Sequence, residues 1–256
     1  MINIWQLIFY LAIIYLLFSF IKFYLKNRNT EDEFTSIVNH TFRTPLTRIN
    51  WISKELENID LPREERLIHI QNLNNATNKL LEIVDLIVGV KDIKNVSQYS
   101  AKEASFRDIV EKSIEKYKEE ITKKNIVFKL SSFNSIPLLI LDISKISFVI
   151  DTLIENAIVY TPSGGGIIID CIFKQPRKEL LFYVGDTGIG LTLYEKIKLF
   201  SRFYRGSRAN GLYPDGMGLR LYLSKQIIKR HNGKIYAKSK GKNKGTVFFI
   251  ELPVRV

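Results

Sequence analysis

A run of about 18 residues without a charged side chain, from Ile4 to Ile21, lies near the start of the chain. At about 1.5 Å per residue, an α-helix of this length nearly crosses the hydrocarbon core of a bilayer. The leader has no basic residue and no small-residue cleavage site follows, so a cleaved signal peptide fits poorly. Basic residues flank only the C-terminal end, which by the positive-inside bias places the rest in the cytoplasm. We predict a transmembrane helix over residues 1–25 of a single-pass protein of the inner (plasma) membrane.

The composition is that of a folded protein with more than one packed unit. The chain has 256 residues, of which 46% are hydrophobic and 25% are charged. A single cysteine, Cys171, excludes an intramolecular disulfide, and three histidines are too few for a Cys/His zinc module. The net charge of +12 suits anionic partners such as nucleotide phosphates, nucleic acid or the inner leaflet, but charge alone does not choose among them.

Two amphipathic helices follow a short juxtamembrane linker, residues 26–33. Apolar positions recur every three or four residues from Phe34 to Ile59, and a second stripe runs from Leu67 to Ile87 after a helix start at Pro62. Two helices alone bury little surface, and a second copy usually completes such a hairpin. We expect residues 34–95 to form an all-α hairpin that becomes a four-helix bundle in a homodimer.

The remaining chain, residues 96–256, mixes helices and strands after a polar connector over residues 91–105. Helices are expected at 106–123, 143–159 and 218–229. Strands are expected from residue 125 and at 167–173, 179–185, 234–238 and 246–252. This mixture indicates an α+β sandwich with one sheet covered by helices.

A histidine and a proline lie close together in the middle of the first predicted helix, in the sequence His-Thr-Phe-Arg-Thr-Pro from His40 to Pro45. A proline there is costly because it removes a backbone hydrogen bond. His40 and Thr44 share a helix face that misses the apolar stripe, so the imidazole is expected to face water or a docked domain. A lone histidine of this kind is most often merely solvated.

Three distant segments suit a nucleotide. Asn156 lies on a helix that ends in a glycine-rich segment, Asp186 precedes Thr-Gly-Ile-Gly after an apolar strand, and Gly216-Met217-Gly218 opens a helix. An amide oxygen suits Mg²⁺, a carboxylate beside a tight turn can accept from an adenine amine, and glycines at a helix N-terminus can cradle phosphates. Taken singly, each of these patterns is weak.

In this order and spacing, with Leu-Phe-Ser-Arg-Phe-Tyr-Arg at residues 199–205 between them, the motifs resemble the membrane sensor histidine kinases of two-component signalling. The resemblance covers residues 31–253. It implies a dimerisation and phosphotransfer hairpin followed by an ATP-binding domain of the kind shared with gyrase and Hsp90.

The resemblance also implies a role for each matching residue. His40 matches the phospho-accepting histidine, and Thr44 matches the residue that orients a water for dephosphorylation of the regulator. Asn156 matches the Mg²⁺ ligand and Asp186 the adenine-recognising carboxylate. The other expected nucleotide contacts are the glycine boxes, the pocket tyrosine, and a lid whose arginine faces the γ-phosphate: Gly188, Gly190, Gly216, Gly218, Tyr160, Phe203 and Arg205.

Four positions depart from the family pattern. Thr41 stands where an acidic residue usually follows the histidine, and a hydroxyl cannot act as the general base. In the pocket, Thr152 replaces an asparagine, Val159 replaces a phosphate-facing lysine, and Arg220 replaces the last glycine of the second box. The guanidinium of Arg220 either reaches the β- or γ-phosphate in place of that lysine or points into water.

The implied function is an ATP- and Mg²⁺-dependent protein-histidine kinase that autophosphorylates His40 and passes the phosphoryl group to an aspartate of a response-regulator receiver domain. Because Thr44 remains while Thr41 has replaced the base, we expect a balance shifted toward regulator phosphatase activity. The alternative is a kinase-like scaffold that docks a regulator without transferring phosphate. No direct contact with nucleic acid is expected, since no basic recognition helix follows a short turn.

Three further residues are given ordinary structural roles. His69 lies off the stripe of the second helix and is expected to be solvated. His231, before Asn-Gly, is expected to cap a helix C-terminus and to complement its dipole. Cys171 lies in an apolar strand and is expected to be a core residue.

Overall fold

The computed structural model describes residues 31–57, 61–92, 99–131, 136–213 and 216–254, and for residues 31–40 it describes the helical backbone. The chain divides into two compact units, Met1–Leu80 and Leu81–Val256, and we describe each by itself. Within the described ranges, no helix is both long and apolar enough to cross a membrane. The transmembrane helix predicted over residues 1–25 lies outside these ranges and stays a prediction.

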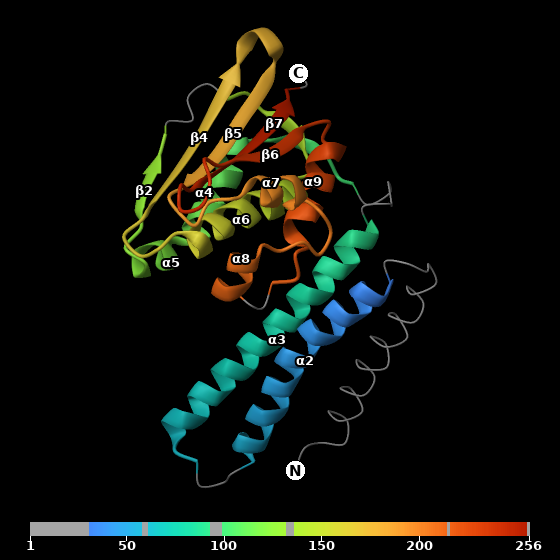
Figure 1. Cartoon of the computed structure of the whole chain (residues 1–256), viewed down its shortest axis with the longest axis vertical. Coiled ribbons are helices and arrows are strands. Elements are labelled where there is room, and N and C mark those ends of the chain that lie inside the picture. Colours follow the sequence, from blue (N-terminus) through green and yellow to red (C-terminus); the bar gives the residue numbers. More distant parts are fainter. Residues whose placement is uncertain (1–30, 58–60, 93–98, 132–135, 214–215, 255–256) are drawn as a thin grey trace. The chain divides into compact units, whose positions relative to one another are not determined.

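The predicted helical region is present as two long helices (Figure 1). Helix α2 spans Glu31–Leu56 and continues through Pro45, and α3 spans Arg63–Asp92. Helix α3 begins directly after Pro62, and its first turn carries Glu64 and Glu65, which complement the positive end of the helix dipole. The division between the two compact units falls within α3.

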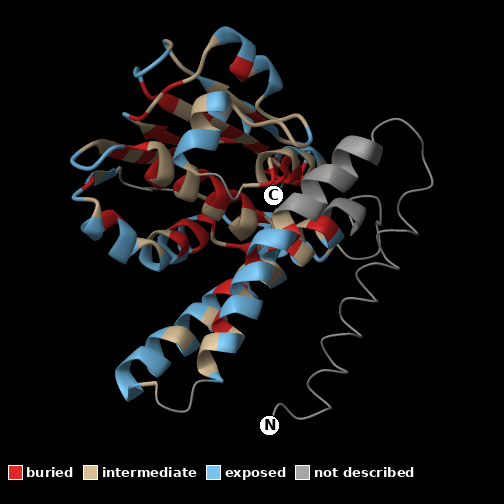
Figure 2. Cartoon of the chain, turned by 60° about the horizontal axis from the view of Figure 1, so that its bottom comes forward, coloured by how far each residue is buried: buried red, intermediate tan, exposed pale blue. Residues whose placement is uncertain are grey.

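The apolar stripes of these helices are only partly buried. Among the buried hydrophobic residues of α2 and α3, Ile52 and Ile87 lie on the predicted stripes, whereas Phe42, Ala76 and Ile83 do not. Large apolar side chains remain in contact with solvent, and Figure 2 shows exposed surface along both helices. The exposed set comprises Trp51, Leu67, Ile68, Ile70, Leu81 and Val88.

The prediction that His69 is solvated is wrong. Its ring is half-buried and meets the ring of Trp51 edge to face, with 5.8 Å between the ring centroids. The Nδ1 atom of His69 is buried without a hydrogen-bond partner among the described residues. His69 therefore contributes to packing on the hairpin.

The C-terminal domain, residues 99–254, is the predicted α+β sandwich. Its five-stranded sheet has the order β2-β4-β5-β7-β6, with β2 parallel to β4 and the other neighbours antiparallel. The strands are β2 Val127–Leu130, β4 Gly166–Lys174, β5 Glu179–Asp186, β6 Lys234–Lys238 and β7 Thr246–Pro253. A separate ribbon pairs β1 Lys102–Ala104 with β3 Leu139–Leu141. A 3₁₀ turn, Gln175–Arg177, joins β4 to β5.

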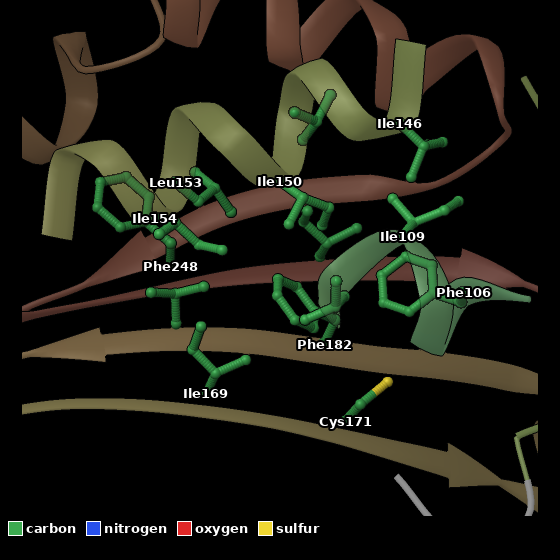
Figure 3. Packing of buried hydrophobic residues seen from close by; sticks show 14 of the residues in the cluster. Phe106, Ile109, Ile146, Ile150, Leu153, Ile154, Ile169, Cys171, Phe182 and Phe248 are labelled. Carbon is green, nitrogen blue, oxygen red and sulfur yellow. The ribbon is translucent and has the colours of Figure 1, made fainter. Parts of the chain in front are cut away.

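Helices cover one face of the sheet, as Figure 1 shows. The main helices are α4 Phe106–Lys116, α5 Lys118–Lys123, α6 Ile143–Tyr160 and α9 Arg220–Arg230. Two short helices, α7 Leu193–Lys198 and α8 Ser207–Leu212, lie between β5 and α9 in the chain. Between α6 and the sheet, side chains from α4, α6, β4, β5 and β7 interlock (Figure 3). The rings of Phe106 and Phe182 meet edge to face, with 5.3 Å between their centroids. Cys171 is buried in this core, as predicted.

The structure contains elements that the hydrophobic pattern did not predict. The helix expected over 106–123 is interrupted at Tyr117, whose backbone leaves the helical region with φ −104°. The predicted polar connector over 91–105 contains β1, and neither its partner β3 nor the short helices α7 and α8 were predicted. Each of these elements has six residues or fewer, too few for a hydrophobic period to be visible.

His231 caps the C-terminus of α9, as predicted, but it does so as a neutral ring. Its Nδ1 lies 2.9 Å from the Ile227 carbonyl, and its Nε2 accepts from the Asp142 backbone N–H at 3.2 Å. An Nε2 that accepts carries no proton, so Nδ1 is the donor. Burial also lowers the pKa of His231 below its usual range. The residue therefore joins the end of α9 to the start of α6, and it does not complement the dipole with a charge.

Candidate nucleotide site

Helix α6 carries two of the predicted site residues near its C-terminus. Its N-cap is Asp142, whose side chain accepts a hydrogen bond from the Lys145 backbone N–H at 3.1 Å. Asn156 donates from Nδ2 to the Thr152 carbonyl at 2.7 Å, which turns Oδ1 of the amide the other way. The Thr152 hydroxyl is buried and donates to the Phe148 carbonyl at 2.8 Å. The Thr152 hydroxyl is therefore satisfied within its own helix, and Asn156 presents an amide oxygen.

Lys124 holds the C-terminal end of α6, a role that sequence reasoning missed. Its ammonium donates to the carbonyls of Ile158, Val159 and Thr161 at 2.7, 3.1 and 3.2 Å. These carbonyls lack partners within the helix, and a cation there complements the helix dipole. Burial lowers the pKa of Lys124 below its usual range. The lysine fixes the turn that leads into the glycine-rich segment at 164–166.

Asp186 stands at the end of β5 with its carboxylate held by the backbone. Oδ1 accepts from the N–H of Gly188 at 2.8 Å and of Thr246 at 3.1 Å. Both of these bonds go to one oxygen, which leaves Oδ2 to accept from a ligand. Burial raises the pKa of Asp186 to about 6, against the opposing effect of the two N–H groups. The Asp186 carboxyl therefore changes its charge near pH 6.

Gly188 and Gly218 are required by close backbone approaches. A Cβ on Gly188 would overlap the Tyr160 carbonyl oxygen, so glycine lets the turn after Asp186 pack on the end of α6. Gly218 has φ +67°, and a Cβ there would lie 2.7 Å from the Phe203 carbonyl carbon. Gly190 follows Gly188 in the same turn, and Gly216 precedes Gly218. The two glycine boxes thus lie against the two segments that were predicted to complete the site.

The segment from Phe203 to Arg205 is bound to the second glycine box. Phe203 donates its N–H to the Gly218 carbonyl at 3.0 Å, and Arg205 donates from Nη1 to the Gly216 carbonyl at 2.8 Å. Arg205 also donates to the carbonyls of Ala209 and Tyr213. Burial raises the pKa of Tyr160, and the arginine opposes that rise. The structure therefore brings Tyr160, Arg205 and the Gly216–Gly218 segment together.

Arg208, on α8, joins this segment to the first glycine box and was not singled out by the sequence. It donates to the carbonyls of Ile189 and Gly190 and forms an ion pair with Glu195 at 3.1 Å. Glu195 is buried and closes a capping box with Thr192 at the start of α7. Burial raises the pKa of Glu195, but the hydrogen bonds from Thr192 and the charge and hydrogen bond of Arg208 outweigh it, so the pKa lies below its usual range. One buried carboxylate thereby links α7, α8 and the turn after Asp186.

Arg220 does not point freely into water, the second of the two positions weighed from the sequence. Its guanidinium pairs with Glu155 at 2.7 Å and lies 5.7 Å from the centre of the Phe148 ring. A cation in the first turn of a helix opposes the dipole, and Glu155 offsets that cost. The predicted contact of Arg220 with a nucleotide phosphate stays a prediction.

The residues present fit a single-ligand Mg²⁺ site. No group of three His, Cys, Asp or Glu side chains that could hold a metal occurs in the part of the chain that the structure describes. Mg²⁺ commonly binds through one or two protein oxygens, with waters and substrate phosphates completing its shell. The Oδ1 atom of Asn156 is such an oxygen.

His40 lies on α2, in the other compact unit. Beside it, Thr41 is half-buried and Thr44 is exposed, as expected for the face that carries His40 and Thr44. The structure therefore collects the predicted nucleotide residues in one domain and leaves the predicted phosphoacceptor on the hairpin.

Comparison with known proteins identifies the family of the C-terminal domain. Residues 141–256 match the model of the histidine kinase-, DNA gyrase B- and HSP90-like ATPases. The sensor protein kinase WalK of Staphylococcus aureus is 30% identical over 249 residues, an alignment that covers 88% of this chain and 54% of that protein. In strain JH9 the matching WalK is covered for 37% of its length. The chain thus spans about a third to a half of the curated relatives it matches.

Solved structures agree with the fold. The catalytic domain of histidine kinase ThkA is 26% identical, with a TM-score of 0.52 over 60% of this chain and 95% of that chain. The Acinetobacter baumannii histidine kinase AdeS is 21% identical, with a TM-score of 0.64 over 85% of this chain and 98% of that one, a likeness of fold. The chain is homologous to the sensor histidine kinases, and its residues 141–256 belong to the histidine kinase-, DNA gyrase B- and HSP90-like ATPases.

Proposed function

We propose that the chain is a membrane-anchored sensor histidine kinase that autophosphorylates His40 from ATP and passes the phosphoryl group to an aspartate of a response-regulator receiver domain. The observation that carries the proposal is the Asp186 carboxylate, held through one oxygen beside Tyr160, in a domain homologous to histidine kinase ATPases. The expected domains are an anchor (1–25), a linker (26–33), a phosphotransfer hairpin (34–95) and an ATP-binding domain (96–256).

The nucleotide would bind through residues whose geometry is already set. Oδ2 of Asp186 accepts from the adenine amine, while Gly188 and Gly190 allow the backbone to approach the ring. Gly216 and Gly218 offer backbone N–H groups to the phosphates at the start of α9, and Arg205 with Phe203 closes the site. Asn156 Oδ1 would hold Mg²⁺, which when bound neutralises charge on the phosphate oxygens.

The chemistry at His40 is phosphoryl transfer. An imidazole nitrogen attacks the γ-phosphorus in line, the bond from the γ-phosphorus to the bridging oxygen breaks, and ADP leaves. Arg205 would stabilise the charge that develops on the γ-phosphoryl oxygens. The imidazole proton must pass to water or to phosphate, because Thr41 has no carboxylate to take it.

Dimerisation of the hairpin is supported by its exposed apolar residues. Trp51, Leu67, Ile68 and Ile70 are between 42% and 58% exposed in the single chain. Monomeric proteins seldom expose so many large apolar side chains together, and a second hairpin would cover them in a four-helix bundle.

The replacement at Thr41 is the specific observation behind a second candidate, a scaffold that docks a regulator without transferring phosphate. Loss of a general base typically costs about 10²–10⁴ in rate. Thr44 is exposed on the hairpin. Because it matches the residue that orients a water in the related kinases, we propose that regulator dephosphorylation is retained while the kinase step is slow.

The test is incubation of the full chain, in detergent or nanodiscs, with Mg²⁺ and ATP labelled on the γ-phosphate. Label on the protein that is lost in acid and kept in base supports the kinase. ATP binding without any such label favours the scaffold. No ATP binding at all contradicts both the pocket assignment and the kinase.

A further inference from the structure

A short helix beside the candidate site exposes apolar side chains to solvent. Helix α7 has six residues, and Leu193, Tyr194 and Ile197 are 76%, 64% and 79% exposed. Its other side is fixed to the domain, because Glu195 is buried and paired with Arg208. The exposed face is therefore a fixed feature of the surface.

A basic hairpin lies next to this face. The last residue of β6 and the turn that follows it read Lys-Ser-Lys-Gly-Lys-Asn-Lys-Gly, residues 238–245. The four lysines of this segment, Lys238, Lys240, Lys242 and Lys244, are all exposed. Lys198, on α7 itself, is also exposed. Four lysines at alternate positions on one turn give a concentrated positive field.

Hydrogen bonds hold α7 and the hairpin side by side. Lys196 donates to the Ser239 carbonyl at 3.2 Å, and the Leu191 N–H donates to the Ser239 hydroxyl at 3.0 Å. Asn243 donates its N–H to the Ile189 carbonyl at 2.7 Å. Figure 1 shows α7 beside β6. We call the exposed residues of α7 and the lysines of the turn the α7–hairpin surface.

Acidic residues are almost absent from the segments that form this surface. Between residues 191 and 210 the single acidic residue is Glu195, which is buried and paired, and there is none between residues 233 and 250. Ordinary charged surfaces intersperse both signs. A surface that combines exposed Leu, Tyr and Ile with uncompensated lysines has the chemistry of proteins that lie on anionic lipid, with apolar side chains in the headgroup region and cations against phosphate.

Chain length brings this domain close to a bilayer, an argument that rests on the proposed anchor and phosphoacceptor. His40 lies fourteen positions after Lys26, a span of about 21 Å if helical and at most roughly 50 Å if extended. A domain of this size is about 40 Å across. To phosphorylate His40, it must therefore work within roughly its own diameter of the lipid headgroups.

We infer that the α7–hairpin surface docks the ATP-binding domain on the anionic lipid surface of the membrane. The lysines of the turn meet lipid phosphates while Leu193, Tyr194 and Ile197 enter the interface. Docking would depend on anionic lipid and weaken with salt, since each lysine at such a surface strengthens binding about fivefold.

The experiment uses the full chain in nanodiscs of phosphatidylcholine with or without phosphatidylglycerol, with brominated acyl chains as quenchers. A fluorophore is placed at Ile197→Cys. The native Cys171 is buried, which keeps it from the label. The matched control is Val127→Cys, 70% exposed on β2 at the opposite edge of the sheet. We expect quenching at position 197 only with phosphatidylglycerol, reversal by salt, and little quenching at position 127.

Lys240→Gln combined with Lys242→Gln should weaken docking roughly 25-fold while leaving ATP affinity unchanged. Equal quenching in both lipids, no quenching, or indifference to the lysine variant would overturn the inference. So would protection of position 197 by a receiver domain in the absence of lipid, which would assign the surface to a protein partner. Co-purification with phosphatidylcholine nanodiscs tests the anchor separately. If the anchor fails, phosphatidylglycerol vesicles added to the labelled chain still decide the inference by the same quenching.

Discussion

The guanidinium of Arg220 lies 2.7 Å from the carboxylate of Glu155, so the first residue of α9 is joined to the residue beside Asn156 on α6. Burial raises the pKa of Tyr117, and the same guanidinium, which lies nearby, opposes that rise. The arginine that replaces a family glycine has therefore gained a structural partner. The pair joins the start of α9 to α6, the helix that carries the proposed Mg²⁺ ligand Asn156.

The pair should contribute measurably to stability. Glu155→Gln is expected to lower the free energy of unfolding by about 1–2 kcal/mol, because it removes the ion pair and leaves a cation in the first turn of α9. Arg220→Gln should cost less, since it removes that cation as well. The double variant should show a coupling of about 0.5–1 kcal/mol by denaturant unfolding. Glu115→Gln, whose salt bridge with Lys118 is exposed, is the control and should stay within about 0.5 kcal/mol. Additive effects of the Glu155 and Arg220 substitutions would contradict a stabilising ion pair between these two residues.

A second experiment on Arg220 tests whether its guanidinium also binds a nucleotide phosphate. If Arg220 also reaches a phosphate, Arg220→Gly should weaken ATP affinity about tenfold, and Val159→Lys in that background should recover much of the loss. Titration with a fluorescent nucleotide measures both. Unchanged affinity in Arg220→Gly would leave Arg220 with the structural role alone.

Asp186 should make nucleotide affinity depend on pH. In the proposed role the carboxylate accepts from adenine. With a pKa of about 6 it becomes protonated as the pH falls, so nucleotide affinity should drop up to tenfold per pH unit below that value. Asp186→Asn should bind weakly and lack this added dependence, which makes it the control for titration of the phosphates. Parallel pH profiles for the two proteins would be inconsistent with this role.

The same group should affect stability in the opposite direction. Its pKa in the folded chain lies above the ordinary 3.8, so the folded state binds the proton more tightly than the unfolded state. Its contribution is complete below about pH 4 and is lost as the pH rises through about 6. Subtracting the unfolding profile of Asp186→Asn should isolate this loss.

Arg208 is predicted to position the lid segment. Arg208→Gln removes its bonds to Ile189 and Gly190 and leaves the buried Glu195 without its cation, at a cost of about 2 kcal/mol. Amides of α8 should exchange faster, and KM for ATP should rise more than kcat falls. Arg202→Gln, at an exposed arginine that lies over the Tyr222 ring, is the control. Unaltered exchange in α8 would refute the positioning role.

Thr41→Glu restores a carboxylate beside His40 and should raise the autophosphorylation rate by one or more decades. Thr41→Gln is the matched variant without a charge and should not. The initial rate of acid-labile labelling measures both. An unchanged or lower rate in Thr41→Glu would show that the missing base does not limit the reaction.

Sequence pattern alone predicted the strands of the sheet well. Strands β5 and β7 alternate buried and half-buried residues along their length, a period of two that is visible without a structure. The bounds of β6 agree at both ends with those predicted, and α6 differs by one residue. The pattern also singled out Asn156 and Asp186, because their neighbouring glycines mark tight turns.

Contacts between distant residues could not be predicted in this way. Arg208 meets Gly190 across 18 residues of chain, and Arg220 meets Glu155 across an even longer stretch. Lys124 caps α6 from a separate turn. No local period marks a charged side chain that caps a helix or joins two loops. The burial of Phe42 and His69 likewise depends on tertiary packing around each helix.

The central claim is that His40 accepts a phosphoryl group from ATP bound by the C-terminal domain. The most direct test is to locate acid-labile label in the full chain after incubation with γ-labelled ATP and Mg²⁺, comparing wild type with His40→Gln and His69→Gln. We predict label at His40 in wild type and in His69→Gln, and none in His40→Gln, with nucleotide affinity equal in all three. Label that persists in His40→Gln would contradict the account.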